Sequence, residues 1–179
     1  MIETAHSLLI EAPIGTVWNY VQDMRRWAIL LPGCKECIVE NPQDSRWILK
    51  VGTGGLVRTV NALVHVDKWE GPGCVDFSYT LEGDPVEGSG SYIAAEKGLQ
   101  TEVTLQVRVQ GSGPLAPMWE AISRPLLPRI AKSFASKLKE EIEKCAGAES
   151  GEFTQGTDNA ARSTLTQKLR NLLPSRTKN

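Results

Sequence analysis

Residues 127–145, LPRIAKSFASKLKEEIEKC, carry the strongest periodic pattern in the sequence. Apolar residues recur at every fourth position and charged residues fill the opposite side, which predicts one long amphipathic helix from Pro125 to Cys145. Pro125 and Pro128 are expected in or before its first turn, because proline further in removes a backbone hydrogen bond and clashes with the preceding turn. The apolar face of this helix, which needs a surface to cover, consists of Ile130, Phe134, Leu138 and Ile142.

The chain before this helix predicts a sheet. Apolar and polar residues alternate in short runs that are separated by glycine, proline, asparagine and aspartate, the residues typical of turns. Short connections favour antiparallel neighbours. Two short helices are expected between the first and second strands, one after Pro13 and one before Pro32. The predicted strands are Ile2–Glu11, Cys37–Val39, Trp47–Val51, Leu56–Trp69, Val75–Leu81, Val86–Ala95 and Thr101–Val109.

The strand that starts at Leu56 shows which side of the sheet faces the core. Side chains of a strand alternate between its two faces, so every second residue shares a face. One face is apolar apart from a single arginine, and we expect the long helix to cover it. That face consists of Leu56, Arg58, Val60, Ala62, Val64 and Val66.

Composition excludes several classes of protein. The net charge of −1 offers no general field for nucleic acid, and no apolar run reaches the roughly 18 residues of a membrane-spanning helix. The N-terminus lacks the basic start and cleavage-like end of a signal peptide. Four scattered cysteines are too few for a disulfide scaffold. We therefore expect a cytoplasmic protein with reduced thiols, possible peripheral contact with the inner membrane face, and no nucleic-acid partner.

The composition changes after Ala146, so three segments are expected: a folded domain over 1–146, a flexible linker over 147–161 and a short basic amphipathic tail over 162–179. The tail has leucines at helical spacing and cations nearby. It is either a disordered end or a weak anchor for a membrane or partner. The candidate contact residues are Arg162, Leu165, Lys168, Leu169, Arg170, Leu172 and Leu173.

The predicted order of elements resembles the helix-grip fold of the START and birch-pollen-allergen (SRPBCC) superfamily. This α+β fold has a curved seven-stranded antiparallel sheet, two short helices after the first strand, and a long C-terminal helix that the sheet wraps. Three strings, Ala12-Pro-Ile-Gly-Thr-Val-Trp18, Leu31-Pro-Gly-Cys34 and Lys50-Val-Gly-Thr-Gly-Gly55, resemble its carbon monoxide dehydrogenase-associated, CoxG-like branch. The resemblance covers about Met1 to Ala146.

The resemblance implies a cavity between the sheet and the helix that holds a lipophilic, lipid- or quinone-like molecule. In that branch it also implies a link to a membrane surface and to a molybdenum hydroxylase-type partner enzyme. A sheet curled around one helix tends to leave a space beside the N-terminal half of the helix, and apolar area would hold the ligand there. The residues expected to bind the ligand are Leu49, Val51, Arg58, Val60, Val64, Phe77, Tyr79, Tyr92, Trp119, Ile122, Leu126, Leu127, Ile130 and Phe134.

Arg58 has two interpretations. An uncompensated guanidinium on an apolar face would cost several kcal/mol, so this side chain needs a partner or water. It either anchors an anionic or carbonyl head group of the ligand, or it reaches out at the strand end and pairs with Glu87 or Glu120.

Other motifs favour no catalytic or metal site and no cofactor. Cys34 and Cys37 lie three residues apart on a strand, so their side chains point to opposite faces, and no second ligand pair completes a zinc site. His65 is expected on the solvent face of its strand, and neither histidine lies in a string with a nucleophile and an orienting acid. The acidic residues around Pro85 are more typical of a solvated turn than of an acid–base pair.

Three functions remain open. The first is a non-enzymatic protein that binds a hydrophobic molecule and presents it to a partner enzyme or membrane. The second is an enzyme similar to the polyketide cyclases and dehydratases of the superfamily, for which only Arg58 and the tyrosines are candidate polar groups. The third is an assembly factor whose interior is filled by its own side chains.

Overall fold

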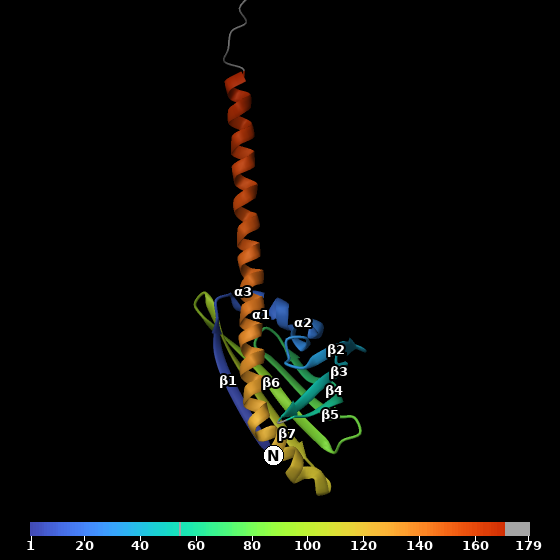
Figure 1. Cartoon of the computed structure of the whole chain (residues 1–179). Helices are drawn as coiled ribbons and strands as arrows, with labels where there is room; N and C mark the ends of the chain where they lie inside the picture. The colour runs from blue at the N-terminus through green and yellow to red at the C-terminus, as the bar shows by residue number, and fades with distance from the viewer. Residues whose placement is uncertain (54, 171–179) are drawn as a thin grey trace, which may run out of the picture. The chain divides into compact units, whose positions relative to one another are not determined.

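The computed structural model describes residues 1–53 and 55–170, with side chains up to Ala148 apart from those of Thr53 and Leu56. Contacts within the chain divide it into two compact units, Met1–Glu143 and Lys144–Asn179. The first unit holds all the strands and the short helices (Figure 1). In chain order the elements are β1 (Ile2–Ile10), α1 (Ile14–Val21), α2 (Met24–Ala28), β2 (Cys34–Val39), β3 (Asp44–Thr53), β4 (Leu56–Glu70), β5 (Cys74–Leu81), β6 (Val86–Lys97), β7 (Gln100–Gly111), η1 (Gly113–Leu115) and α3 (Ala116–Arg170).

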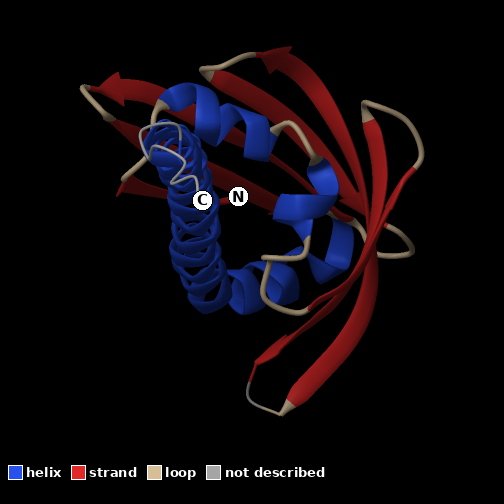
Figure 2. Ribbon diagram, turned by 90° about the horizontal axis from the view of Figure 1, so that it is seen from above, coloured by secondary structure: helices blue, strands red, loops and turns tan. Residues whose placement is uncertain are grey.

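The strands form one seven-stranded antiparallel sheet in the order β1-β7-β6-β5-β4-β3-β2. From β2 to β7 each strand pairs with the next along the chain, as the short turns predict, and β1 joins the far edge beside β7. The sheet curves around α3 on its inner side (Figure 2). The predicted α+β helix-grip architecture is confirmed.

The inner face of the sheet and the apolar face of α3 make the core. On β4, the buried side chains of Val60, Val64 and Val66 alternate with exposed ones, which confirms the expected inner face. On α3, Leu138 and Ile142 are almost completely buried. This part of the helix is therefore packed tightly against the sheet.

The start of α3 differs from the prediction. The helix begins at Ala116, so Pro125 and Pro128 lie inside it and not in its first turn. Each proline lacks the N–H of one helical hydrogen bond, and such positions commonly bend a helix. The first turns of α3 run at an angle to the part that follows (Figure 2). The prediction was wrong because a bent helix can continue through proline when its side chains are packed on both sides of the bend.

Two side chains of α3 bind the backbone at the end of β1. The ammonium group of Lys139 donates to the carbonyl of Leu9 over 2.7 Å, and the carboxylate of Glu143 accepts from the N–H of Glu11 over 2.7 Å. Lys139 and Glu143 also pair with each other. These bonds fix the helix to the edge strand of the sheet.

The predicted linker, 147–161, falls within the bounds of α3, and the division into linker and tail stays a prediction. Side chains after Ala148 are not described. In the part of the chain that was searched, no helix has both the length and the apolar character that crossing a membrane requires.

Candidate functional site

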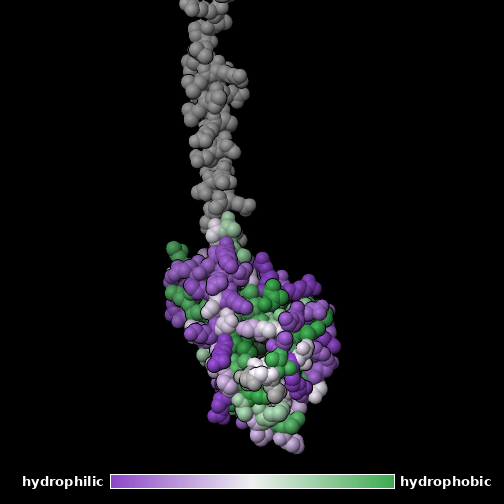
Figure 3. Space-filling model, viewed as in Figure 1, coloured by the Kyte–Doolittle hydropathy of each residue, from purple (hydrophilic) through white to green (hydrophobic). Residues whose placement is uncertain are grey.

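A cavity of about 220 Å³ lies between the inner face of the sheet and α3. Strands β3 to β7, the short helix α2 and the first half of α3 all contribute to its wall. Hydrophobic side chains gather in the middle of one face of this unit, with hydrophilic ones around them (Figure 3). An engineered apolar cavity of about 150 Å³ holds benzene, so this one has room for a larger apolar molecule.

Every residue expected to bind the ligand lines this cavity except Arg58. The apolar faces of β4 and α3 predicted these positions, because both faces turn toward the same space. Whether the residues bind a ligand remains a prediction. The residues that the structure brings together are Leu49, Val51, Val60, Val64, Phe77, Tyr79, Tyr92, Trp119, Ile122, Leu126, Leu127, Ile130 and Phe134.

Arg58 lies outside the cavity wall, and its expected inward placement was wrong. Its side chain is 51% exposed, and its guanidinium pairs with the carboxylate of Asp84 over 3.3 Å. The guanidinium also lies 5.9 Å from the ring centre of Trp119. Arg58 stands near the start of β4, so its long side chain can reach solvent while its neighbours on the same face stay buried.

Sequence reasoning missed several wall residues. Val86, Val107 and Val109 continue the alternation of β6 and β7 and could have been found from it. Ser123 could have been found from helical spacing only if α3 had been started earlier. Trp27 had no signal, because the direction of a five-residue helix depends on what it packs against.

Trp27 is the centre of an aromatic cluster at the cavity wall. Its ring centre lies 5.0 Å from that of Trp47, 6.1 Å from that of Phe77 and 6.3 Å from that of Phe134. The contacts with Trp47 and Phe134 are edge-to-face, a favourable arrangement of aromatic rings. Three elements of the fold, α2, the sheet and α3, meet in this cluster.

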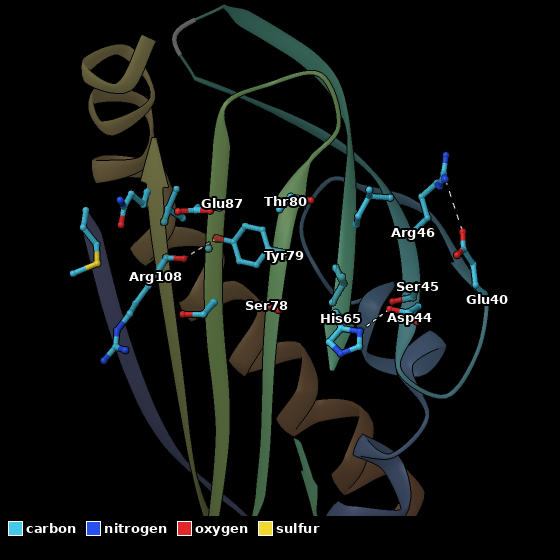
Figure 4. A pocket seen from close by; sticks show the side chains of 17 residues that line it. Glu40, Asp44, Ser45, Arg46, His65, Ser78, Tyr79, Thr80, Glu87 and Arg108 are labelled. Carbon is cyan, nitrogen blue, oxygen red and sulfur yellow. Dashed lines mark hydrogen bonds and ion pairs between the residues drawn. The ribbon is translucent and has the colours of Figure 1, made fainter. Parts of the chain in front are cut away.

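Two glycines on β6 leave space for the aromatic rings of β5. A Cβ atom at Gly88 would lie 2.3 Å from the ring of Tyr79, and one at Gly90 would lie 2.3 Å from the ring of Phe77. The open position at Gly88 lets the hydroxyl of Tyr79 donate to the backbone carbonyl of Arg108 over 2.9 Å (Figure 4). Glycine at position 88 thus places Tyr79 in the cavity wall.

The polar groups of the wall are few and uncharged. Among the described residues, no Lys, Arg, His, Asp or Glu lines the cavity, and its ionisable groups are the hydroxyls of Tyr79 and Tyr92. Burial raises the pKa of both hydroxyls, so each stays protonated at neutral pH. A group of this kind is a poor general base. The wall therefore suits binding better than proton transfer.

A second, more open pocket of about 760 Å³ lies on the outer face of the sheet (Figure 4). Its side chains include His65, exposed as predicted, whose Nδ1 lies 2.6 Å from a carboxylate oxygen of Asp44. This hydrogen bond raises the pKa of His65 and lowers that of Asp44. The cations and anions of this pocket are mixed, so its charge selects no particular ligand.

The cysteines and the tail add no second site within the described residues. Burial raises the pKa of Cys34 and Cys37, which makes their thiolates scarcer than in an exposed cysteine. No group of three metal-ligating side chains occurs in the searched part of the chain. Of the expected tail contacts, Leu172 and Leu173 lie outside the described residues. The side chains of Arg162, Leu165, Lys168, Leu169 and Arg170 are not described.

Comparison with known proteins gives both a family and a set of similar folds. Residues 1–143 match the family described as polyketide cyclase/dehydrase and lipid transport. No curated protein matches the sequence.

Solved structures with this fold come from several bacteria. A conserved protein of Geobacillus kaustophilus is 18% identical with a TM-score of 0.69, over 80% of this chain and 96% of that one. The Zhui aromatase/cyclase of Streptomyces sp. R1128 is 18% identical with a TM-score of 0.57, over 80% and 94%. A START superfamily protein of Mycobacterium smegmatis is 14% identical with a TM-score of 0.58, over 77% and 97%. At these identities the similarity shows the fold.

Proposed function

Because this chain belongs to the polyketide cyclase/dehydrase and lipid transport family, we propose that it binds a hydrophobic small molecule in the cavity between its sheet and α3. The observation that carries this proposal is a cavity of about 220 Å³ whose wall is apolar apart from a few uncharged side chains. Sites for small ligands combine these features, a mostly apolar wall and a few polar groups.

The protein acts as a binding protein in this proposal, and an enzyme is the second candidate. An acid–base enzyme needs a group whose pKa lies near the working pH. The tyrosine hydroxyls have raised pKa values, and no carboxylate or histidine of the described residues lines the cavity. The family includes cyclases and dehydrases, which keeps an enzyme in view. A filled interior, as expected for an assembly factor without a ligand, agrees less well with a cavity of this volume.

A finer proposal concerns what happens to the bound molecule. The three strings that resemble the carbon monoxide dehydrogenase-associated, CoxG-like branch support delivery of the ligand to a partner. The candidate recipients are a molybdenum hydroxylase-type enzyme and a membrane surface, with the basic tail as the contact. Deletion of 162–179 tests this: it should weaken co-sedimentation with anionic vesicles and leave ligand binding intact. Equal sedimentation of both proteins would exclude the tail as an anchor.

Binding is tested with N-phenyl-1-naphthylamine, a neutral dye that becomes fluorescent in apolar sites. At about 0.4 kcal/mol for each of its roughly 17 non-hydrogen atoms, the dye should bind with a Kd on the order of 10 µM. Organic extracts of the purified protein, examined by mass spectrometry, should contain a co-purified apolar molecule. A wild-type protein that does not bind the dye and yields an empty extract would contradict the proposal.

Substitutions locate the binding site. Ala62 is buried at the cavity wall, so Ala62→Phe should fill part of the space and weaken dye binding at least about tenfold. Leu63, the next residue of β4, points to the outer face and is 37% exposed, so Leu63→Phe is the matched control and should bind normally. Thermal unfolding checks that both variants fold. Ile122→Trp, on the opposite wall, provides a second filling variant if Ala62→Phe does not fold.

A further inference from the structure

Three buried hydrogen-bond donors at the cavity wall have no partner among the described residues. They are the hydroxyl of Tyr92 and the indole N–H groups of Trp27 and Trp119. Their side chains belong to residues that are only 4%, 9% and 5% exposed, and all three residues line the cavity. A buried donor without an acceptor carries a free-energy penalty, and the great majority of such groups in proteins are paired.

The unpaired groups share one chemical property. An indole N–H can only donate, and a protonated phenol that lacks an acceptor is also an available donor. Burial raises the pKa of Tyr92, which keeps its proton in place. The groups come from α2, β6 and the first turns of α3, so they surround the cavity from different sides. A complementary ligand would bring acceptors.

The cavity also disfavours charge. No cationic side chain of the described residues lines it, and the guanidinium of Arg58 lies outside, paired with Asp84. A carboxylate placed inside would lose its hydration without an opposite charge to replace it. A plain hydrocarbon would fit the apolar wall but would leave all three donors unpaired.

Resting on the function proposed above, we infer that the ligand is an uncharged, largely apolar molecule that carries oxygen acceptors, such as ring carbonyls. The hydroxyl of Tyr92 and the indoles of Trp27 and Trp119 donate to these oxygens. A free fatty acid and an unsubstituted hydrocarbon are both poorer ligands than a neutral ketone or quinone of the same size.

Three compounds with one ring frame test this inference: fluorene, 9-fluorenone and fluorene-2-carboxylate. Their affinities are measured by displacement of N-phenyl-1-naphthylamine from the full chain. Fluorenone should bind about fivefold or more tightly than fluorene, since one buried hydrogen bond is gained. The carboxylate should bind more weakly than fluorene. Equal affinities of fluorene and fluorenone, or tightest binding of the carboxylate, would overturn the inference while the proposed function stands. Failure of the dye itself would refute the proposed function.

The substitution Tyr92→Phe removes one donor and keeps the ring. It should reduce the preference for fluorenone over fluorene at least about twofold, with fluorene binding unchanged. Tyr20→Phe is the matched control, because Tyr20 does not line the cavity and its hydroxyl donates to the carbonyl of Arg26. An unchanged preference in Tyr92→Phe would exclude this hydroxyl as a ligand donor.

Unfolding of the free protein gives a readout that needs no ligand. Tyr92→Phe should not lower the Tm, because an unpaired hydroxyl is removed, whereas Tyr20→Phe removes a paired one and should lower it. An equal loss of Tm in the two variants would show that the Tyr92 hydroxyl is paired within the protein, and would overturn its role in the inference.

Discussion

Replacing Gly88 by alanine should destabilise the first unit by about 2–4 kcal/mol. The new Cβ atom would lie 2.3 Å from the backbone oxygen of Arg108 and 2.3 Å from the ring of Tyr79. Carbon atoms in contact prefer about 3.5–4.0 Å, so the ring must retreat by more than ~1 Å. The backbone oxygen belongs to β7 and cannot move without disturbing the sheet.

Two contributions make up this magnitude. Overpacking of a well-filled interior costs about 1–3 kcal/mol. Displacement of Tyr79 breaks the 2.9 Å hydrogen bond from its hydroxyl to Arg108, which adds about 1 kcal/mol. For a chain of this size each kcal/mol lowers the Tm by about 2–4 °C, so a loss of roughly 5–15 °C is expected. Dye binding should also weaken, because Tyr79 is part of the cavity wall.

Thermal unfolding followed by circular dichroism measures this effect, and two further variants interpret it. Tyr79→Phe removes only the hydrogen bond and should cost about 1 kcal/mol. Gly15→Ala is the control: no atom lies within 4 Å of the added Cβ, and alanine stabilises a helix relative to glycine by about 0.5–1 kcal/mol. A Tm of Gly88→Ala within about 1 °C of wild type would refute the close approach of these three groups.

Two further predictions concern the outer pocket and the core. The His65–Asp44 pair should stabilise the fold between the ordinary pKa values of aspartate and histidine, because the pKa of His65 is raised and that of Asp44 is lowered. Its contribution is lost as pH rises through the folded pKa of His65 or falls through that of Asp44, and NMR titration should show a lower His65 pKa in Asp44→Asn; an unchanged titration would exclude the pair. Ile142→Ala should cost about 2–5 kcal/mol because Ile142 is fully buried in packed core, while Ile122→Ala beside the cavity should cost less than half as much in chemical unfolding. Equal costs would contradict a difference in packing between the two halves of α3.

The sequence predicts the sheet and most of the cavity wall because alternation and helical spacing are local signals. On β4, the period of two places Val60 and Val64 on the inner face. On α3, the period of 3.6 places Ile130 and Phe134 on the side that the sheet covers. Any two apolar faces of one small domain must meet, so the site follows from the faces alone.

Other features depend on tertiary contacts that no local pattern records. Arg58 shares the inner face of β4 by alternation, yet its charge draws it to solvent and to Asp84. The prolines at 125 and 128 predict the start of a helix, whereas the structure places them within one. The wall position of Trp27 follows from its contacts with rings of the sheet and α3.

The bonds from Lys139 and Glu143 to β1 also bear on self-association. A strand at the edge of a sheet presents free backbone groups that can template an added strand from another molecule. Here the carbonyl of Leu9 and the N–H of Glu11 are already occupied by side chains of the gripped helix. That end of the edge is thereby closed to intermolecular strand addition, so the contact that holds the ligand-binding unit together also protects it from aggregation.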